Sequence, residues 1–255
     1  MEYGAFSHKG LQRKYNEDYY YIPENDDEPA IMMVADGMGG HNAGERASKL
    51  AVEYVVSYFE KYKDNLKYTE ELVQAIQDSI EQANEHVLGL SRMEERFSGM
   101  GTTLTLVVFD VDRFHVAHIG DSRCYLIRNG SVRQITRDHT LVQELLDHGS
   151  ITKYEMDIHP KRNVITRALG TEDKLRIDCF EEVLQAGDII LLCTDGLINY
   201  VDLEKTITNL PQNISMLQLA EMLGRKALAA GGSDDITITA ARYTGMEKRG
   251  ENLAG

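Results

Sequence analysis

Acidic residues stand at the ends of four strand-like apolar runs, and this placement constrains the fold more than any other feature of the chain. The runs are residues 31–35, 114–119 and 189–194, which lead into Asp36-Gly37, Gly120-Asp121 and Asp195-Gly196, and residues 236–241, which follow Asp234-Asp235. Apolar runs of about four to eight residues are typical of strands. Where such strand ends converge, carboxylates share a small volume and must protonate or bind cations, because like charges repel.

A hairpin and three helices complete the expected elements. Asn129-Gly130 separates two strand-like runs, and this dipeptide favours a type I′ turn because both residues tolerate positive φ. A tight hairpin pairs its strands antiparallel, which excludes a simple parallel α/β sheet. Apolar residues recur at helical spacing in three segments, residues 47–58, 72–87 and 215–230. Ser215 and Gln218 have capping-box spacing at the start of the third. The pattern predicts packed sheets covered by helices.

The composition is that of an ordinary globular chain. Of the 255 residues 42% are hydrophobic and 27% are charged, and no repeat, low-complexity stretch or Pro-rich linker interrupts the pattern. We therefore expect a single domain over residues 1–243 and a polar tail over residues 244–255. The N-terminus lacks a signal peptide, and no apolar run approaches the roughly 20 residues of a membrane span, so we expect a cytoplasmic protein without a membrane partner.

The charge and the cysteines narrow the function classes further. A formal net charge of -14 argues against nucleic acid as a partner, since that function needs Lys and Arg clustered along one face. The acidic excess reflects either solubility or carboxylates that bind cations, and composition alone does not separate the two. Cys124, Cys179 and Cys193 lack C-x-x-C spacing and lie in or beside apolar runs, which predicts buried, reduced thiols.

Six motifs carry a resemblance to a known family. In chain order they are Arg13-x-x-Asn16-Glu17-Asp18, Asp36-Gly37-Met38-Gly39-Gly40-His41, Ser98-Gly99-Met100-Gly101-Thr102-Thr103, Gly120-Asp121-Ser122-Arg123, Thr194-Asp195-Gly196-Leu197 and Gly232-Ser233-Asp234-Asp235-Ile236-Thr237. Across residues 3–243 the chain resembles the metal-dependent Ser/Thr phosphatases of the type 2C class, in their compact bacterial form. The resemblance implies an α+β fold, a four-layer α/β/β/α sandwich with two central antiparallel β-sheets, and a binuclear metal site at one edge of the sandwich.

The resemblance also assigns metal ligands by position. Asp36 is expected to bridge two metal ions, and the carbonyl of Gly37 to bind one of them. Asp195 and Asp234 are expected to complete the coordination of the first ion, and Glu17 is expected to hold water molecules bound to the second. Oxygen ligands of this kind favour Mn²⁺ or Mg²⁺.

Two further acids match the family less directly. Asp121, together with Asp195, matches a third and weaker metal position of the family. Asp18 is similar to an acid that supports the ligands from behind, and the alternative for it is an ordinary cap or turn residue. Asp235 stands where the family usually has asparagine, and its added charge either tightens metal binding or alters a local hydrogen bond.

The resemblance implies a hydrolysis mechanism. Two metal ions roughly 3.5 to 4 Å apart activate a shared water, and the resulting hydroxide attacks the phosphorus of phosphoserine or phosphothreonine. Arg13 matches the phosphate-binding arginine of the family, and a guanidinium can meet two phosphate oxygens at once. Eukaryotic relatives have a histidine directly after Asp-Gly, where this chain has Met38. His41 is therefore the candidate general acid, and a water on a metal ion is the alternative.

The expected partners are phosphorylated proteins, including those marked by a bacterial Ser/Thr kinase, and we expect a monomer. Two alternatives remain: a hydrolase of small phosphate esters with the same site, and a catalytically inactive relative that binds phosphoproteins. No cysteine has an arginine six positions later, which excludes the thiol-phosphatase mechanism. Asp110-x-Asp112 is interpreted as a hairpin turn, and residues 149–163 take the place of the family's flap, as a mobile loop over the site or a long surface loop.

Overall fold

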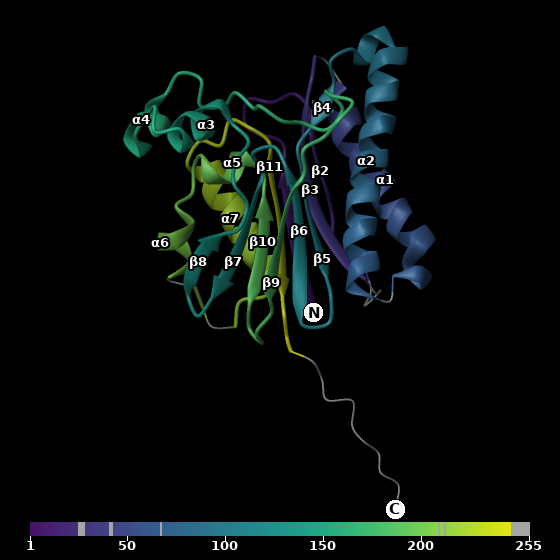
Figure 1. Ribbon diagram of the computed structural model, residues 1–255. Coiled ribbons are helices and arrows are strands. Elements are labelled where there is room, and N and C mark those ends of the chain that lie inside the picture. The colour runs from purple at the N-terminus through teal and green to yellow at the C-terminus, as the bar shows by residue number, and fades with distance from the viewer. Residues whose placement is uncertain (25–28, 41–42, 67, 209, 212, 246–255) are drawn as a thin grey trace, which may run out of the picture.

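Two antiparallel β-sheets packed face to face form the centre of the computed structural model (Figure 1). The structure describes residues 1–24, 29–40, 43–66, 68–208, 210–211 and 213–245. One sheet has the strand order β1 (Glu2–His8), β11 (Ile236–Arg242), β10 (Ile189–Cys193), β7 (Arg123–Arg128) and β8 (Ser131–Gln134). The other has the order β2 (Asp18–Tyr21), β3 (Ala30–Met38), β5 (Leu104–Phe109), β6 (Arg113–Ile119) and β9 (Asp178–Val183), and β4 (Gly101–Thr102) pairs with β3.

The central strands are continuous apolar runs because both of their faces are covered. In β3, Met32 belongs to the core between the two sheets, whereas Met33 belongs to the core beneath the helices. In β10, Ile190 faces the other sheet and Leu191 faces the helices of its own side. Side chains alternate between the faces of a strand, so a strand buried on both faces has no polar alternation.

Helices cover the outer face of each sheet and complete the four layers (Figure 1). Helices α1 (Ala43–Tyr62) and α2 (Thr69–Met93) pack on the sheet that contains β3. Helix α7 (Met216–Ala229) packs on the sheet that contains β11, beside the short helices α5 (Asp195–Ile198) and α6 (Leu203–Ile207). The remaining short helices are α3 (Leu141–Asp147), α4 (Lys153–Ile158) and two 3₁₀ turns, η1 (Lys63–Asn65) and η2 (Glu95–Phe97).

Several local predictions are confirmed. Strands β7 and β8 form the predicted hairpin, with φ of 52° at Asn129 and 76° at Gly130. The backbone N–H of Gln218 donates to Ser215 Oγ at 3.1 Å, which is half of the predicted capping box of α7. Asp110 and the residues after it form the turn between β5 and β6. In the described part of the chain no helix combines the length and the apolar character that crossing a membrane requires.

Two predictions need correction. Cys179 is exposed, whereas Cys124 and Cys193 are buried as predicted. The reason is that Cys179 lies on β9, the edge strand of its sheet, where burial alternates along the strand. The predicted loop at residues 149–163 contains α4, which begins where Thr152 Oγ1 accepts the N–H of Glu155. Of the tail predicted at residues 244–255, only residues 244–245 are described.

Candidate active site

Asp18 and Asp36 lie side by side in one sheet, and Asp18 connects this sheet to the other. They are register partners of β2 and β3, and directly opposed residues of an antiparallel pair have their side chains on the same face. Asp18 is buried, and its Oδ2 accepts the hydroxyl of Thr194 at 2.8 Å. Thr194 Oγ1 in turn accepts the N–H of Thr237 at 3.0 Å. The carboxylate of Asp18 therefore links β2 to the ends of β10 and β11, which belong to the other sheet.

Four other acidic residues surround Asp36. Burial, and then the negative charges of neighbouring aspartates, raise the pKa of Asp36 well above its ordinary value; these neighbours are Asp18, Asp195, Asp121 and Asp234. Burial and the charge of Asp195 raise the pKa of Asp121 to about 8. Burial and the charge of Asp234 raise the pKa of Asp195 to about 6. The carboxylates that the sequence analysis selected thus share one volume and repel one another.

The donor set fits hard divalent cations. Three carboxylate oxygens of this group are buried without a hydrogen-bond partner: Asp18 Oδ1, Asp121 Oδ1 and Asp195 Oδ1. A buried polar atom without a partner destabilises the fold by about 1–3 kcal/mol, and carboxylate oxygens are preferred ligands of Mg²⁺ and Mn²⁺. What fits is the chemical type of the donor atoms. Among the described residues, no group of three His, Cys, Asp or Glu side chains has the geometry of a metal site.

Arg13 lies between two of the predicted ligands. Its Nη2 lies 2.6 Å from Asp234 Oδ1, and its Nη1 lies 3.5 Å from Glu17 Oε2. The Arg13 side chain is 44% exposed, whereas that of Glu17 is 16% exposed. The guanidinium thus offsets part of the negative charge of the acidic group, and its exposure leaves it accessible from solvent.

Glu17 and Gly37 are held against the first turn of α1. The carbonyl of Glu17 accepts the N–H of Gly37 at 3.1 Å and the hydroxyl of Ser48 at 2.6 Å. A Cβ on Gly44 would lie 2.7 Å from Glu17 Oε1 and 2.8 Å from the carbonyl oxygen of Gly37. Only glycine at position 44 lets the helix approach both predicted ligands. Sequence reasoning missed Gly44, and a glycine near the start of a helical pattern is the signal that was available.

Asp235 holds the segment that carries Arg13 and Glu17. It is buried, its Oδ1 accepts the N–H of Gly10 at 3.0 Å, and its Oδ2 accepts the N–H of Glu17 at 2.8 Å. An asparagine has only one acceptor oxygen and would direct an N–H group at one of these donors. Of the two explanations for this departure from the family pattern, the structure therefore supports the local hydrogen bonds.

Asp121 is placed by the connection between β6 and β7. The preceding residue, Gly120, exchanges two hydrogen bonds with His139: Gly120 donates to His139 Nδ1 at 3.1 Å, and the N–H of His139 donates to the carbonyl of Gly120 at 2.7 Å. Arg123, on the other side of Asp121, pairs with the buried Asp138 at 2.6 Å. His41, the predicted general acid, lies outside the described residues.

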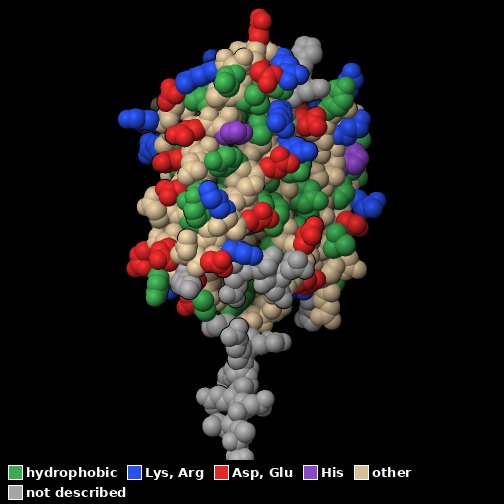
Figure 2. Space-filling view, turned by 90° about the vertical axis from the view of Figure 1, so that its right-hand side faces the viewer, with side chains coloured by type: hydrophobic (Ala, Val, Ile, Leu, Met, Phe, Trp, Pro, Cys, Tyr) green, Lys and Arg blue, Asp and Glu red, His purple; other side chains and the backbone are tan. Residues whose placement is uncertain are grey.

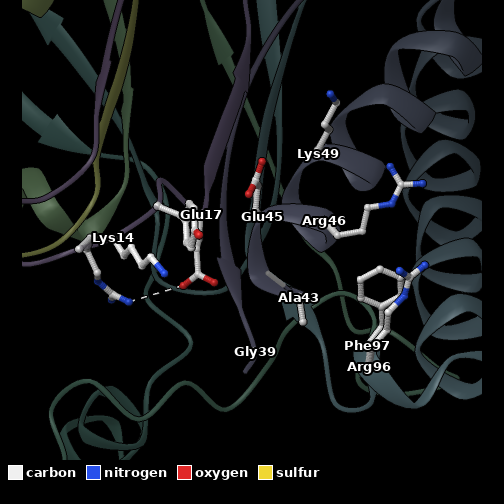
Figure 3. A pocket seen from close by; sticks show the side chains of 11 residues that line it. Lys14, Glu17, Gly39, Ala43, Glu45, Arg46, Lys49, Arg96 and Phe97 are labelled. Atoms are coloured by element: carbon white, nitrogen blue, oxygen red, sulfur yellow. Dashed lines mark ion pairs between the residues drawn. The ribbon is translucent and has the colours of Figure 1, made fainter. Parts of the chain in front are cut away.

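A cavity of about 930 Å³ opens beside the acidic group (Figure 3). Arg13 and Glu17 belong to its wall, so that the cavity reaches the predicted phosphate-binding residue and one of the predicted metal ligands. In Figure 3, Lys14 and Glu17 lie on one side of the cavity, and Arg46, Arg96 and Phe97 lie on the other. A substrate larger than a phosphate group can therefore enter next to the carboxylates.

The sequence and the fold both match known proteins. The sequence model of the family described as Protein phosphatase 2C matches residues 8–229. The serine/threonine phosphatase stp of Listeria innocua is 38% identical over 240 residues, which cover 94% of this chain and 95% of the relative. The crystal structure of the serine/threonine phosphatase Stp1 from Staphylococcus aureus has a TM-score of 0.88 and 31% identity, and the match covers 96% of each chain.

A further solved structure bears on the metal. The catalytic domain of the serine threonine protein phosphatase PstP, in complex with two manganese ions, has a TM-score of 0.79 and 36% identity. The match covers 94% of this chain and 96% of that domain.

The fold, the carboxylates at its strand ends and these matches define a metal-dependent phosphatase. The chain belongs to the protein phosphatase 2C family. The predicted family and the predicted four-layer fold are both confirmed. The two alternatives, a hydrolase of small phosphate esters and an inactive phosphoprotein-binding relative, are not favoured by relatives that are themselves serine/threonine phosphatases.

Proposed function

We propose that this chain hydrolyses phosphoserine and phosphothreonine residues of other proteins with Mn²⁺ or Mg²⁺ held at the acidic group. The observation that carries the proposal is the group of three buried, unpartnered carboxylate oxygens, those of Asp18, Asp121 and Asp195. Beside this group lies the partly exposed guanidinium of Arg13, which pairs with Asp234 at 2.6 Å and by its charge offsets part of the rise that burial causes in the pKa of Asp195. Metal-dependent hydrolysis of a phosphate monoester requires a cationic side chain that binds the phosphate and, next to it, carboxylates that bind metal ions. Neither the guanidinium nor the carboxylates alone would favour this function.

The proposed metal ligands follow the positions described above. Asp36, Asp195 and Asp234 would hold one cation, and Asp36 a second whose waters Glu17 would hold. The carbonyl of Gly37 would bind one of these two cations. Asp121 with Asp195 would hold a third. When bound, such cations lower the pKa of water and withdraw charge from phosphate oxygens.

The side chains of the protein have tasks of their own. Arg13 presents donors in the wall of the cavity, where they can bind two equatorial oxygens of the phosphate and fix its orientation. To do so it exchanges part of its pairing with Asp234 for pairing with the substrate. Asp18 links β2 to the other sheet through its hydrogen bond with Thr194. His41 remains the proposed donor of a proton to the leaving serine or threonine oxygen.

The setting of the enzyme is also part of the proposal. We propose that residues 1–243 form one catalytic domain, that the protein acts as a monomer in the cytoplasm, and that a bacterial Ser/Thr kinase phosphorylates its substrates. Neither nucleic acid nor a membrane is proposed as a partner. The strongly acidic sequence supports the first of these exclusions.

Hydrolysis of a phosphothreonine peptide by the purified protein, with Mn²⁺ and then with excess EDTA, tests the proposal. Turnover is expected with the metal and should disappear with the chelator. The double substitution Asp36→Ala and Asp195→Ala should reduce turnover by at least about a thousandfold, because both would remove ligands of the same ion. Wild-type turnover by that variant, or none by the wild type with Mn²⁺, would overturn the proposal.

A further inference from the structure

The cavity beside the acidic group has more cationic than anionic side chains in its wall. Five Lys or Arg residues and two Glu residues belong to its wall: Arg13, Lys14, Arg46, Lys49, Arg96, Glu17 and Glu45. This excess of positive charge stands on a chain whose formal net charge is -14. The outer face of the α1 and α2 layer, by contrast, carries Lys, Arg, Asp and Glu side chains interspersed (Figure 2). The positive charge of the cavity is therefore local.

Two of the five cations are available to a ligand. Lys14 and Arg46 are exposed, and neither forms an ion pair with any described residue. Arg96 pairs with Glu94 at 2.6 Å, and Lys49 lies 3.8 Å from Glu53. Lys14 follows Arg13 in the N-terminal segment, whereas Arg46 lies on α1, so the two reach the cavity from different elements (Figure 3).

The aromatic rings of the wall are already in contact with cations. The guanidinium of Arg96 lies 4.5 Å from the centroid of Phe97, and Lys14 Nζ lies 5.1 Å from the centroid of Tyr15. These contacts keep the charged groups at the cavity surface. They also leave less ring surface for a stacked base, so the wall is better suited to a negatively charged chain than to a nucleotide.

We propose that this cavity binds acidic residues that flank the phosphorylated residue of a protein substrate, and that Lys14 and Arg46 are the residues that recognise them. The inference rests on the proposed function, since it places the phosphate at Arg13 and the neighbouring peptide in the cavity. A volume of about 930 Å³ accommodates several side chains beyond the phosphate. Carboxylates there would meet unpaired cations, whereas lysines would be repelled.

Two phosphothreonine peptides that differ only in Glu or Gln at the positions on both sides of the phosphothreonine test the inference. Glu and Gln have nearly the same shape, so the difference in kcat/KM reports charge. We expect the Glu peptide to have a kcat/KM roughly 3- to 10-fold higher, because each partly exposed ion pair contributes a small factor. This ratio should approach one as the salt concentration rises from about 50 to about 500 mM.

Substitutions then assign the effect to the proposed residues. The combined Lys14→Gln and Arg46→Gln variant should bring the Glu/Gln ratio close to one. Arg225→Gln is the matched control, because Arg225 is an exposed arginine of α7 on the opposite layer, and it should keep the wild-type ratio. Arg46→Glu should lower kcat/KM for the Glu peptide and raise it for a peptide with Lys at the flanking positions.

The outcomes separate this inference from the function on which it rests. Equal kcat/KM for both peptides in the wild type overturns the inference and leaves the phosphatase activity standing. A wild-type ratio that survives in the Lys14→Gln, Arg46→Gln variant also overturns it. If neither peptide is hydrolysed with Mn²⁺ present, the proposed function itself fails and the inference fails with it.

Discussion

The buried carboxylate of Asp235 accepts the backbone N–H of Glu17 at 2.8 Å, and the two residues are 218 positions apart in the chain. The other oxygen of the same carboxylate accepts the N–H of Gly10 at 3.0 Å. Asp235 thus fastens both ends of the segment that carries Arg13 to the start of β11. Asp235, which follows the predicted metal ligand Asp234, therefore positions Arg13, the predicted phosphate-binding residue.

Replacing Asp235 with asparagine should weaken this attachment. Asp235→Asn keeps one acceptor and leaves one buried N–H facing an amide group, so the free energy of unfolding should fall by about 1–2 kcal/mol. KM for a phosphothreonine peptide should rise, because Arg13 is held less firmly. Denaturant unfolding and steady-state kinetics measure the two effects. Asp112→Asn, at an exposed position in the turn before β6, is the control, and equal stability of the two variants would contradict the prediction.

A side chain at position 44 should disturb the predicted metal ligands. The Cβ of Gly44→Ala would lie 2.7 Å from Glu17 Oε1 and 2.8 Å from the carbonyl oxygen of Gly37, and a backbone carbonyl cannot move away freely. We expect a loss of about 1–3 kcal/mol in the free energy of unfolding and a higher Mn²⁺ concentration for half-maximal activity.

Gly89→Ala is the matched control for this substitution. Gly89 lies within α2, and a Cβ there would meet no atom within 4 Å. Because alanine favours the helix, this variant should be more stable than the wild type by about 0.5–1 kcal/mol. The prediction for position 44 fails if Gly44→Ala behaves in the same way as Gly89→Ala.

Asp195 should destabilise the folded protein when the metal is removed with EDTA at about pH 8. Burial and Asp234 raise the pKa of Asp195 to about 6, so the folded state binds a proton more tightly than the unfolded state does. In EDTA this stabilising contribution is fully present below about pH 4 and is lost as the pH rises through about 6. Asp195→Asn in EDTA at about pH 8 should therefore be more stable than the wild type by about 1–2 kcal/mol.

The same substitution should have the opposite effect in the presence of Mn²⁺. With Mn²⁺ present, binding of the metal ion should stabilise the wild type, and it should stabilise Asp195→Asn less. Thermal or denaturant unfolding with and without Mn²⁺ measures both. A variant that is destabilised equally in EDTA and in Mn²⁺ would show that Asp195 is not a ligand.

A buried histidine should make the protein sensitive to acid. Burial, followed by the nearby ring of His139, lowers the pKa of His118 from 6.5 to about 3. The ring has a hydrogen-bond partner at each nitrogen: its Nε2 lies 3.1 Å from the carbonyl oxygen of Arg137 and its Nδ1 lies 2.9 Å from Thr105 Oγ1. Burial nevertheless favours its neutral form. The unfolded chain binds this proton below about pH 6.5 and the folded chain does not. Stability should fall by up to about 1.4 kcal/mol per pH unit as the pH decreases towards 3.

The contribution of His118 has to be measured by comparing the wild type with a variant. The acidic group titrates over part of the same pH range, and its protonation stabilises the folded state, whereas protonation of His118 destabilises it. Denaturant unfolding of the wild type and of His118→Gln between about pH 7 and pH 4 isolates it. We expect a shallower loss of stability on acidification in the variant. Parallel pH profiles would contradict the assignment.

Much of the architecture follows from local patterns in the sequence. The apolar runs of β3 and β10 predict strands covered on both faces, and Asn129-Gly130 predicts the hairpin, since each depends on residues close together in the chain. The same patterns missed β1, β2 and the edge strand β9. In β9 burial alternates along the strand, which leaves polar residues within it. The family was also predictable, because its motifs lie within short segments.

The tertiary structure alone decided how these segments meet. Gly44 contacts Glu17 and Gly37 because α1 packs on β3, and Asp235 reaches Gly10 across 225 positions because β1 and β11 are neighbours in one sheet. The cations of the cavity likewise come from the N-terminal segment, α1 and η2. Residue periodicity reports only the near neighbours of a residue along the chain. Contacts between distant segments depend on the packing of whole sheets and helices, which no local pattern encodes.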